Sequence, residues 1–365
     1  MKKIVALLLA VVMVLALAAC NTSNTPSTTA GSGSETNGET TPATTVGAKK
    51  KVALITNTLG ASAFIDNGAA GFRETAEKYG FEYSIAECAD DASYEENARA
   101  LVNDGYDLIL GLSWQAANAI SAVATDYPDA AAYALVDSST GLDNVMDVNF
   151  HEEDGAYLIG QLAALTVDGE SHNYGAVHAQ QTQSGFEKWR YPYMQGVLSI
   201  DPDAKFTFNF VGSYSDPDTA YKLALQQYEL GCLFINAACA GGDQGVFKAA
   251  QEKHFYTSGQ DEDLTTPDNP YVVSCQIKDT YNAVAYVLDT FASGNWTAED
   301  VNLGINDNAI GAVYVTHETD TPRSDRLSDE DIALLKQTAE DLKAGKIDLS
   351  SPGPEEDYKY PSILG

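Results

Sequence analysis

The chain has 365 residues, and 44% of them are hydrophobic. A chain of this length and hydrophobic content exceeds what one compact core usually requires, so we expect about two domains. Its 52 acidic residues against 21 basic ones give a formal net charge of -31, and no segment clusters Lys and Arg with interleaved aromatic residues. We therefore expect no nucleic-acid partner. A strongly anionic ligand would need a local basic pocket that opposes the overall field.

Residues 1–19 have the pattern of a lipoprotein signal peptide. Lys2 and Lys3 precede an apolar run from Ile4 to Ala18, and small residues lead to Cys20. The run is shorter than the roughly 20 apolar residues that span a membrane. We expect cleavage before Cys20 and diacylation of this cysteine, which would anchor the protein on the extracytoplasmic face of the cell membrane. An ordinary secretory signal with a chance cysteine remains the alternative.

The cysteine anchor and the segment after it, residues 20–48, form the second predicted unit. Residues 21–48 are almost all Ser, Thr, Gly, Asn, Pro and Ala, with Val46 as the only larger apolar residue. Such a composition cannot bury enough surface to offset its ordering entropy and predicts a flexible tether. Four further cysteines lack CxxC spacing, and buried free thiols are favoured over a disulfide for them: Cys88, Cys232, Cys239 and Cys275.

From residue 49 onward, short apolar runs alternate with helical segments in two successive series. This pattern is typical of parallel sheets covered on both faces, and it predicts two doubly wound α/β lobes. We assign 49–172 to an N-terminal lobe and 173–278 to a C-terminal lobe. We expect a helix at 279–293 to complete the first lobe, 300–316 to complete the second, and 317–365 to form a C-terminal helix and tail.

The predicted elements follow in chain order. Strands are expected at 50–56, 81–88, 106–112, 131–137, 145–150, 173–179, 205–212, 232–238, 255–259 and 271–277. Helices are expected at 63–79, 94–103, 115–126, 153–167, 185–199, 217–230, 244–254, 279–293 and 329–347.

Ligands of open parallel sheets bind beyond the carboxyl ends of the strands, and two such edges facing one another would form a clamshell. Six polar or aromatic residues and one glycine stand at these predicted ends in both lobes: Asn57, Trp114, Asp137, Gln180, Gly241, Asp261 and Lys278. A planar ligand could stack on Phe64, Trp114 and either Trp189 or Tyr193. Backbone amides at Gly241 and Gly242 could meet a ligand oxygen, although a plain tight connection is equally compatible.

Catalytic and metal-binding patterns are weak. The chain has no GxSxG elbow and no phosphate loop, and its five histidines show neither HxH nor HxxxH spacing. The acidic run Asp261, Glu262 and Asp263 lacks the frame of a calcium loop. We expect no metal and no cofactor, and we interpret Glu262 and Asp263 as solvated loop.

Several segments together resemble the basic membrane protein family of ABC-transporter substrate-binding lipoproteins. They include "AFIDNGAAGF", "VNFHEEDGAYLIGQLAAL", "VGSYSDPDTAYKLALQQYELGCLFINAACAGGDQGV" and "VVSCQIKDTYNAV". The resemblance implies a type I periplasmic-binding-protein fold with hinge crossovers and a nucleoside in the interlobe cleft.

The same resemblance implies roles for individual residues. Asp261 and Lys278 would hold the ribose hydroxyls, with backbone at Gly241 or Gly242. Asp137 and Phe64 also match family positions. The first helix departs from the family pattern, because no acid precedes Phe64 and Ile65 replaces the usual Asn. Asn57, Asp66 or Asn67 would have to substitute in base recognition.

These observations predict a monomeric, membrane-anchored receptor that delivers a nucleoside, with a purine favoured, to an ABC permease and its ATPase. Two alternatives remain open. The same fold could bind a sugar, an autoinducer or another small polar ligand for transport or sensing. A surface hydrolase acting on nucleosides or glycans could use Asp137 and Asp261 as a carboxylate pair.

Overall fold

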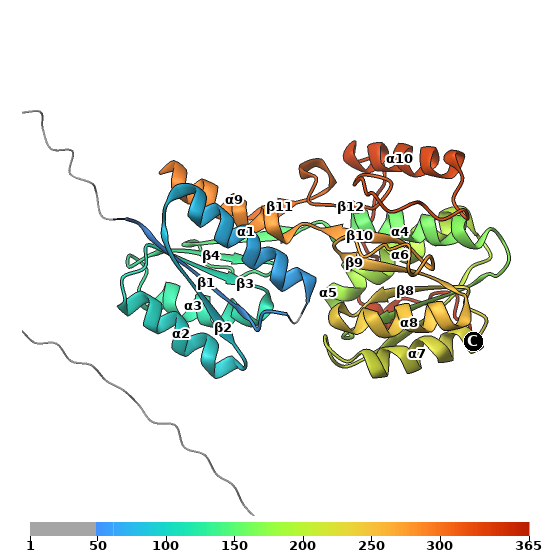
Figure 1. The fold of residues 1–365 in the computed structure, drawn as a ribbon, viewed down its shortest axis with the longest axis horizontal. Coiled ribbons are helices and arrows are strands. Elements are labelled where there is room, and N and C mark those ends of the chain that lie inside the picture. Colours follow the sequence, from blue (N-terminus) through green and yellow to red (C-terminus); the bar gives the residue numbers. More distant parts are fainter. Residues whose placement is uncertain (1–48, 61, 365) are drawn as a thin grey trace, which may run out of the picture. The chain divides into compact units, whose positions relative to one another are not determined.

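The computed structural model describes residues 49–60 and 62–364 (Figure 1). The predicted signal peptide, Cys20 and the linker lie outside the described residues. In the part of the chain that is described, no helix is both long and apolar enough to cross a membrane.

The first lobe is built on a six-stranded parallel sheet of strand order β11-β5-β4-β3-β1-β2. Helices α1 (Ala63–Tyr79) and α9 (Thr280–Ser293) cover one face, and α2 (Asp91–Asn103) and α3 (Ala117–Asp126) cover the other (Figure 1). The strands are β1 (Lys51–Asn57), β2 (Glu82–Cys88), β3 (Leu108–Leu112), β4 (Ala132–Val136), β5 (Val145–Phe150) and β11 (Val301–Leu303).

The second lobe repeats this plan with the order β12-β10-β9-β8-β6-β7, in which only the β10–β12 pair is antiparallel. Its strands are β6 (Asn173–His178), β7 (Lys205–Phe210), β8 (Phe234–Ala238), β9 (Tyr256–Asp261), β10 (Val272–Lys278) and β12 (Ile310–Ala312). One face packs against α4 (Glu152–Val167), α6 (Tyr191–Ile200) and α10 (Asp329–Lys343), and the other against α7 (Pro217–Glu229) and α8 (Asp243–Lys253).

Short helical segments complete the fold. They are α5 (Gln183–Gly185), the π-helical turn η2 (Phe186–Arg190) and the 3-10 turns η1 (Trp114–Ala116), η3 (Ala240–Gly242), η4 (Ile305–Asp307) and η5 (Glu355–Asp357). The single helix predicted at 185–199 is therefore divided into α5, η2 and α6. A π-helical turn of this kind frequently marks a functional site.

The predicted fold class is confirmed: two α/β lobes, each a mainly parallel sheet between two layers of helices. The chain crosses between the two sheets three times. The crossings run from β5 to α4, from β10 to α9 and from β11 to β12.

Two boundary predictions are corrected. The N-terminal lobe does not extend to residue 172, because α4 is buried in the core of the second lobe beside α6 and α10. Gly160 of α4 and Gly196 of α6 allow this contact, since a Cβ at either would strike the backbone of the other helix. The segment 300–316 does not belong to the second lobe alone, because β11 extends the first sheet and only β12 joins the second.

Helix ends follow local signals in the sequence. Ser62 caps α1 by accepting the Ile65 amide, and Gly80 ends the helix with a φ of 67°. Asp279 caps α9 by accepting the Asn282 amide at 2.9 Å, directly after β10. These caps fix the turns that connect each strand to the following helix, and residues of such turns form the candidate site.

The four cysteines of the described residues are free and buried, as predicted. Cys232, Cys239 and Cys275 lie in one apolar core of the second lobe, and Cys88 lies in a core of the first. Burial raises the pKa of Cys232 and of Cys275 to about 12, so these thiols are unreactive near neutral pH.

Candidate functional site

The carboxyl ends of β4, β9 and β10 bring three predicted residues together. Asp137 follows β4, Asp261 ends β9 and Lys278 ends β10. Asp137 and Asp261 have left-handed backbones, with φ of 69° and 73°. Asp adopts this region more readily than most residues because its short side chain can bond locally. These two turns direct the chain out of each sheet at the strand end.

Lys278 is the centre of an ion-pair network that joins the two lobes. Its Nζ contacts Asp137 of the first lobe and lies 3.0 Å from Glu152 Oε1 at the start of α4. The ammonium also lies 5.2 Å from the centre of the Phe64 ring and 5.1 Å from that of Phe150. A buried cation is thus held by carboxylates and by aromatic faces.

A second lysine completes the network from the π-helical turn. Lys188 Nζ lies 2.7 Å from Glu152 Oε2 and donates to the Phe150 carbonyl at 2.9 Å. Glu152 therefore bridges two lysines through its two oxygens, and its side chain is almost fully buried. The bridge connects η2, α4 and β10.

The pKa values follow from this arrangement. Burial opposes the charged form of Lys278, but the carboxylates of Asp137, Glu152 and Asp261 outweigh it and raise the lysine pKa. Burial also acts to raise the pKa of Glu152, but Lys278 and Lys188 outweigh it and the pKa is lowered. For Asp137, burial prevails over the adjacent Lys278 and the pKa is raised. Lys278 and Glu152 are thus held in their charged forms.

Asp261 has a different electrostatic balance. It is 9% exposed, and burial raises its pKa to about 7, with Lys278 opposing and Asp137 adding to the rise. Burial likewise raises the pKa of nearby Asp243 to about 7, although Asp243 accepts the Cys239 amide at 2.7 Å. Asp261 therefore holds a proton more readily than an ordinary carboxyl, and any hydroxyl donor placed against it would favour the carboxylate.

The three consecutive acids at the end of β9, Asp261, Glu262 and Asp263, have different surroundings. Glu262 was interpreted as solvated loop, and this is corrected: its Oε2 accepts from Asn67 Nδ2 at 3.1 Å and so links the second lobe to α1. Asp263 is exposed and accepts the backbone and side chain of Thr265, as in a polar turn. Of the three acids, Asp261 is the buried one, and Lys278 and Asp137 influence its pKa.

Two predicted residues near β1 serve the loop between β1 and α1. Asn57 Oδ1 accepts the Thr58 amide at 2.7 Å, and Asp66 Oδ1 accepts the Gly60 amide at 2.8 Å. Both oxygens are thus engaged in local turn contacts. The sequence pattern did not indicate that these two side chains would be bonded to the backbone of the loop.

The remaining predicted residues surround the network. Trp114 begins η1 after β3 and is 55% exposed, and Trp189 is half-buried in η2 beside Lys188. Gly241 and Gly242 form η3, which lies against α1, and Gly242 is buried over the Cys239 thiol. The structure therefore groups Phe64, Asp137, Asp261 and Lys278. The two tryptophans and the two glycines lie around this group.

Three residues of this region were not predicted: Glu152, Lys188 and Tyr214. Glu152 carries a usable signal, because it follows β5 at the same sheet edge as Asp137 follows β4. Tyr214 is 42% exposed, and its partial burial and Asp137 raise its pKa, while Lys278 opposes the rise. Tyr214 therefore lies close to the network, and its position in the loop after β7 was the available signal.

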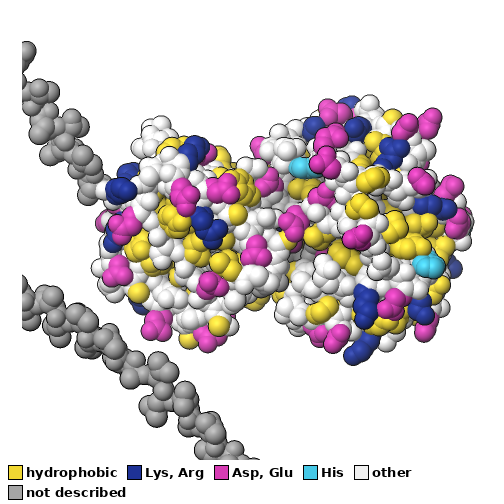
Figure 2. Space-filling model, in the orientation of Figure 1, with side chains coloured by type: hydrophobic (Ala, Val, Ile, Leu, Met, Phe, Trp, Pro, Cys, Tyr) yellow, Lys and Arg dark blue, Asp and Glu magenta, His cyan; other side chains and the backbone are white. Residues whose placement is uncertain are grey.

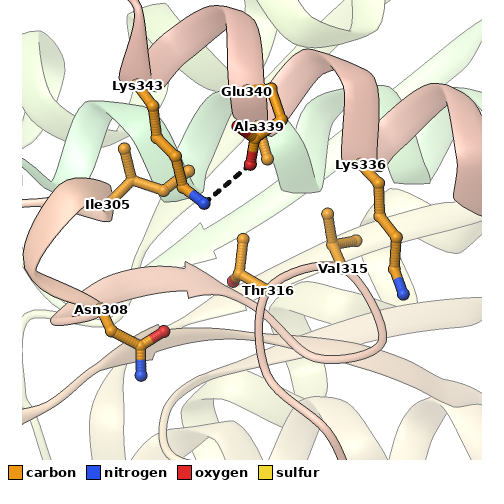
Figure 3. Close-up of a pocket in the computed structure, with 8 residues that line it drawn as sticks. All are labelled: Ile305, Asn308, Val315, Thr316, Lys336, Ala339, Glu340 and Lys343. Atoms are coloured by element: carbon orange, nitrogen blue, oxygen red, sulfur yellow. Dashed lines mark hydrogen bonds and ion pairs between the residues drawn. The ribbon is translucent and has the colours of Figure 1, made fainter.

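A separate cavity lies between η4 and α10 (Figure 3). Its volume is about 230 Å³, and none of the predicted ligand residues lines it. Lys343 and Glu340, one turn apart on α10, pair beside the cavity at 2.8 Å. Its lining consists of Ile305, Asn308, Val315, Thr316, Lys336, Ala339, Glu340 and Lys343.

The surface matches the composition. On the face drawn in Figure 2, acidic side chains are scattered over the described residues of both lobes, and Lys and Arg form no continuous basic patch. The cations closest to the candidate site, Lys278 and Lys188, are both paired with carboxylates. The site therefore has little cationic capacity left for an anionic group.

Comparison with known proteins gives consistent results. The model of the family described as "ABC transporter substrate-binding protein PnrA-like" matches residues 48–347. Basic membrane protein A of Borreliella burgdorferi is 25% identical over 279 residues, covering 72% of this chain and 79% of that protein. The ABC transporter nucleoside-binding protein BmpA of Lactococcus lactis is 27% identical over 182 residues, covering 49% and 50%.

The matched region is shorter in other relatives, and the chain spans 46% of two Listeria proteins. Among solved structures, a solute-binding protein of an ABC transporter system from Aeropyrum pernix K1 superposes with a TM-score of 0.73 at 20% identity. That alignment covers 84% of this chain and 95% of the other.

Proposed function

Because the chain belongs to the family of PnrA-like ABC transporter substrate-binding proteins, we propose that it binds a nucleoside between its two lobes. The observation that carries this proposal is that Asp261 and Lys278 end two adjacent strands, with Lys278 next to the Phe64 ring. One group accepts hydrogen bonds and the other donates them, which suits the vicinal hydroxyls of a ribose.

The ribose and the base would be recognised by different parts of the site. The Asp261 carboxylate accepts from the ribose hydroxyls, and Lys278 donates to a ribose oxygen. The base stacks on an aromatic ring, for which Phe64 and Tyr214 are the candidates. Nucleosides are favoured over nucleotides because both lysines of the network are already paired with carboxylates.

A binding role fits the chemistry better than catalysis. The hydrolase alternative needs Asp137 and Asp261 as a free carboxylate pair, whereas Asp137 is in direct contact with the Lys278 ammonium. An ion pair at this position holds the two lobes together and engages the acid that the hydrolase alternative requires to be free. Closure around the ligand would then present one surface to an ABC permease and its ATPase.

The base-recognition loop supports a second candidate ligand. The groups expected to replace the missing acid and Asn are engaged elsewhere: Asp66 by Gly60, and Asn67 by Glu262. A small polar ligand with vicinal hydroxyls but without a purine, such as a pentose, would use the Asp261 and Lys278 pair alone.

Isothermal titration of the purified protein with a panel of nucleosides tests the proposal. Ribonucleosides should release heat with a micromolar or tighter dissociation constant, and their 5′-monophosphates should bind at least about tenfold more weakly, because the phosphate finds no unpaired cation. A panel that contains free ribose and arabinose separates the two candidates. Binding of the pentoses alone would favour the second candidate, and absence of heat with every nucleoside would refute the first.

We also propose that the mature protein is anchored through a lipid on Cys20. Cys20→Ser removes the acyl acceptor, so we expect the protein to move from the membrane pellet to the soluble fraction after cell fractionation. Ser23→Ala, three residues further on, is the matched control and should remain in the pellet. A Cys20→Ser protein that still sediments with membranes would contradict the anchor.

A further inference from the structure

The last described residues, 348–364, form a segment that we call the tail, and it lies beyond the region that the family model matches. The tail runs along β7, the edge strand of the second sheet. The Phe206 amide donates to the Pro361 carbonyl at 2.8 Å, and the Ile363 amide donates to the Phe206 carbonyl at 3.1 Å. The tail thereby pairs the backbone groups of Phe206 at this sheet edge.

The tail also supplies the carboxylate of a buried ion pair. Arg190, at the end of η2, is fully buried. Its Nε donates to Glu355 Oε1 at 2.9 Å and its Nη2 to Glu355 Oε2 at 2.6 Å, and Nη2 also donates to the Thr182 carbonyl at 3.0 Å. Such a bidentate pair fixes both position and orientation. Within the described residues no other carboxylate reaches ion-pair distance of this guanidinium.

Aromatic contacts hold the tail against both ends of the same turn. The Tyr358 ring lies 5.5 Å from that of Phe186, where η2 begins, and 5.3 Å from that of Tyr191, which follows it. The Glu355 amide donates to Gln183 Oε1 at 3.0 Å. The tail therefore contacts η2 through the ion pair with Arg190 and the ring of Phe186. It also contacts the flanking helices, α5 through the hydrogen bond to Gln183 and α6 through the ring of Tyr191.

Lys188 lies in η2 between these contacts, and it belongs to the ion-pair network of the candidate site. Lys188 pairs with Glu152, and Glu152 pairs with Lys278. Only one residue separates Lys188 from Arg190, so a shift of the arginine would move the lysine as well. A continuous chain of contacts thus leads from Glu355 through Arg190 and η2 to Glu152 and Lys278.

We propose that the tail is a positioning element of the ligand site, and that Glu355 acts through Arg190 to fix the π-helical turn that presents Lys188 and Trp189. The effect on nucleoside affinity rests on the proposed function, whereas the effect on η2 does not. Glu355 is a positioning residue, because it contacts Arg190 and not the ligand network.

The test uses Glu355→Gln in the full chain, since glutamine keeps the shape and one acceptor but removes the charge. The protein carries 5-fluorotryptophan, and the three tryptophans are followed by fluorine NMR, with Trp189 identified by the loss of its signal in Trp189→Phe. We expect the Trp189 resonance to shift or broaden in Glu355→Gln, and nucleoside affinity to fall about fivefold. Trp296, which packs on Phe291 of the first lobe, should be unchanged.

Glu356→Gln is the matched control, because Glu356 is the exposed neighbour, and it should alter neither readout. Tyr358→Ala, which keeps the ion pair and removes the aromatic contacts, is the second variant and should also shift Trp189. An unchanged Trp189 resonance in both tail variants would overturn the proposal, as would wild-type affinity in both. If the wild-type protein binds no nucleoside, the proposed function fails and the Trp189 resonance alone decides on the tail.

Discussion

Lys278→Met is expected to abolish nucleoside binding and to lower the free energy of unfolding by about 3–5 kcal/mol at pH 8. The ammonium is buried and neutralises Asp137 and Glu152. Methionine fills a similar volume but leaves both carboxylates without their shared cation. Urea unfolding at pH 8 measures the loss of stability, and isothermal titration measures the loss of binding.

The pH dependence of this loss follows from the sign of the pKa changes. Lys278 opposes the rise that burial imposes on the pKa of Asp137 and Glu152, so both values increase when it is removed. A carboxyl with a raised folded-state pKa destabilises the protein above that pKa and ceases to do so once protonated. The deficit of Lys278→Met should therefore shrink between pH 8 and pH 5.5.

Two controls make the Lys278 prediction specific. Lys248→Met removes an exposed lysine of the same lobe and should change stability by less than about 0.5 kcal/mol. The double variant Lys278→Met with Asp137→Asn removes one orphaned charge and should recover part of the lost stability. A deficit that does not change with pH, or a double variant less stable than the single one, would contradict the network.

Asp261→Asn is expected to weaken nucleoside binding about 100-fold at pH 8, because hydrogen bonds to a charged group contribute about 1.5–3 kcal/mol each. Asparagine is chosen because residue 261 has a φ of 73°, which alanine adopts with strain and asparagine tolerates. Titration at several pH values provides a second readout. Wild-type affinity should rise as pH increases through about 7, when Asp261 ionises, and the variant should show no such rise.

Stability should move in the opposite direction from binding. Burial raises the pKa of Asp261 to about 7, so ionisation opposes folding at high pH and is harmless at low pH. Asp261→Asn should therefore be at least as stable as the wild type at pH 8. Asp263→Asn, two residues further in the exposed turn, should leave affinity within about twofold. Equal losses in the two variants would argue against a specific role for Asp261.

Most of the fold is predictable from the sequence because its signals are local. Buried parallel strands are continuous apolar runs, and residues such as Ser62, Gly80 and Asp279 mark the helix ends. The assignment of α4 to a lobe is not local. Its residues are buried on nearly all sides, so periodicity does not show which sheet it covers. The three-residue strands β11 and β12 are likewise too short to reveal their partners.

The site divides in the same way. Asp137, Asp261 and Lys278 were predictable because parallel strands end at one edge of a sheet. Glu152 follows β5 at the same sheet edge and was overlooked. Lys188 was not predictable, because its contact with Glu152 joins residues 36 positions apart along the chain. The pair of Arg190 and Glu355 spans 165 positions. A single charged residue in the sequence does not indicate which distant residue of opposite charge it will contact in the fold.

The most direct test of the central claim is a titration of the protein at pH 8 with inosine and, separately, with 2′,3′-dideoxyinosine. The two ligands share a base and differ only in the hydroxyls that Asp261 and Lys278 are proposed to hold. We expect inosine to bind at least about 100-fold more tightly, since each hydroxyl to a charged group contributes about 1.5–3 kcal/mol. Equal affinities, or heat from neither ligand, would contradict recognition of the ribose at this site.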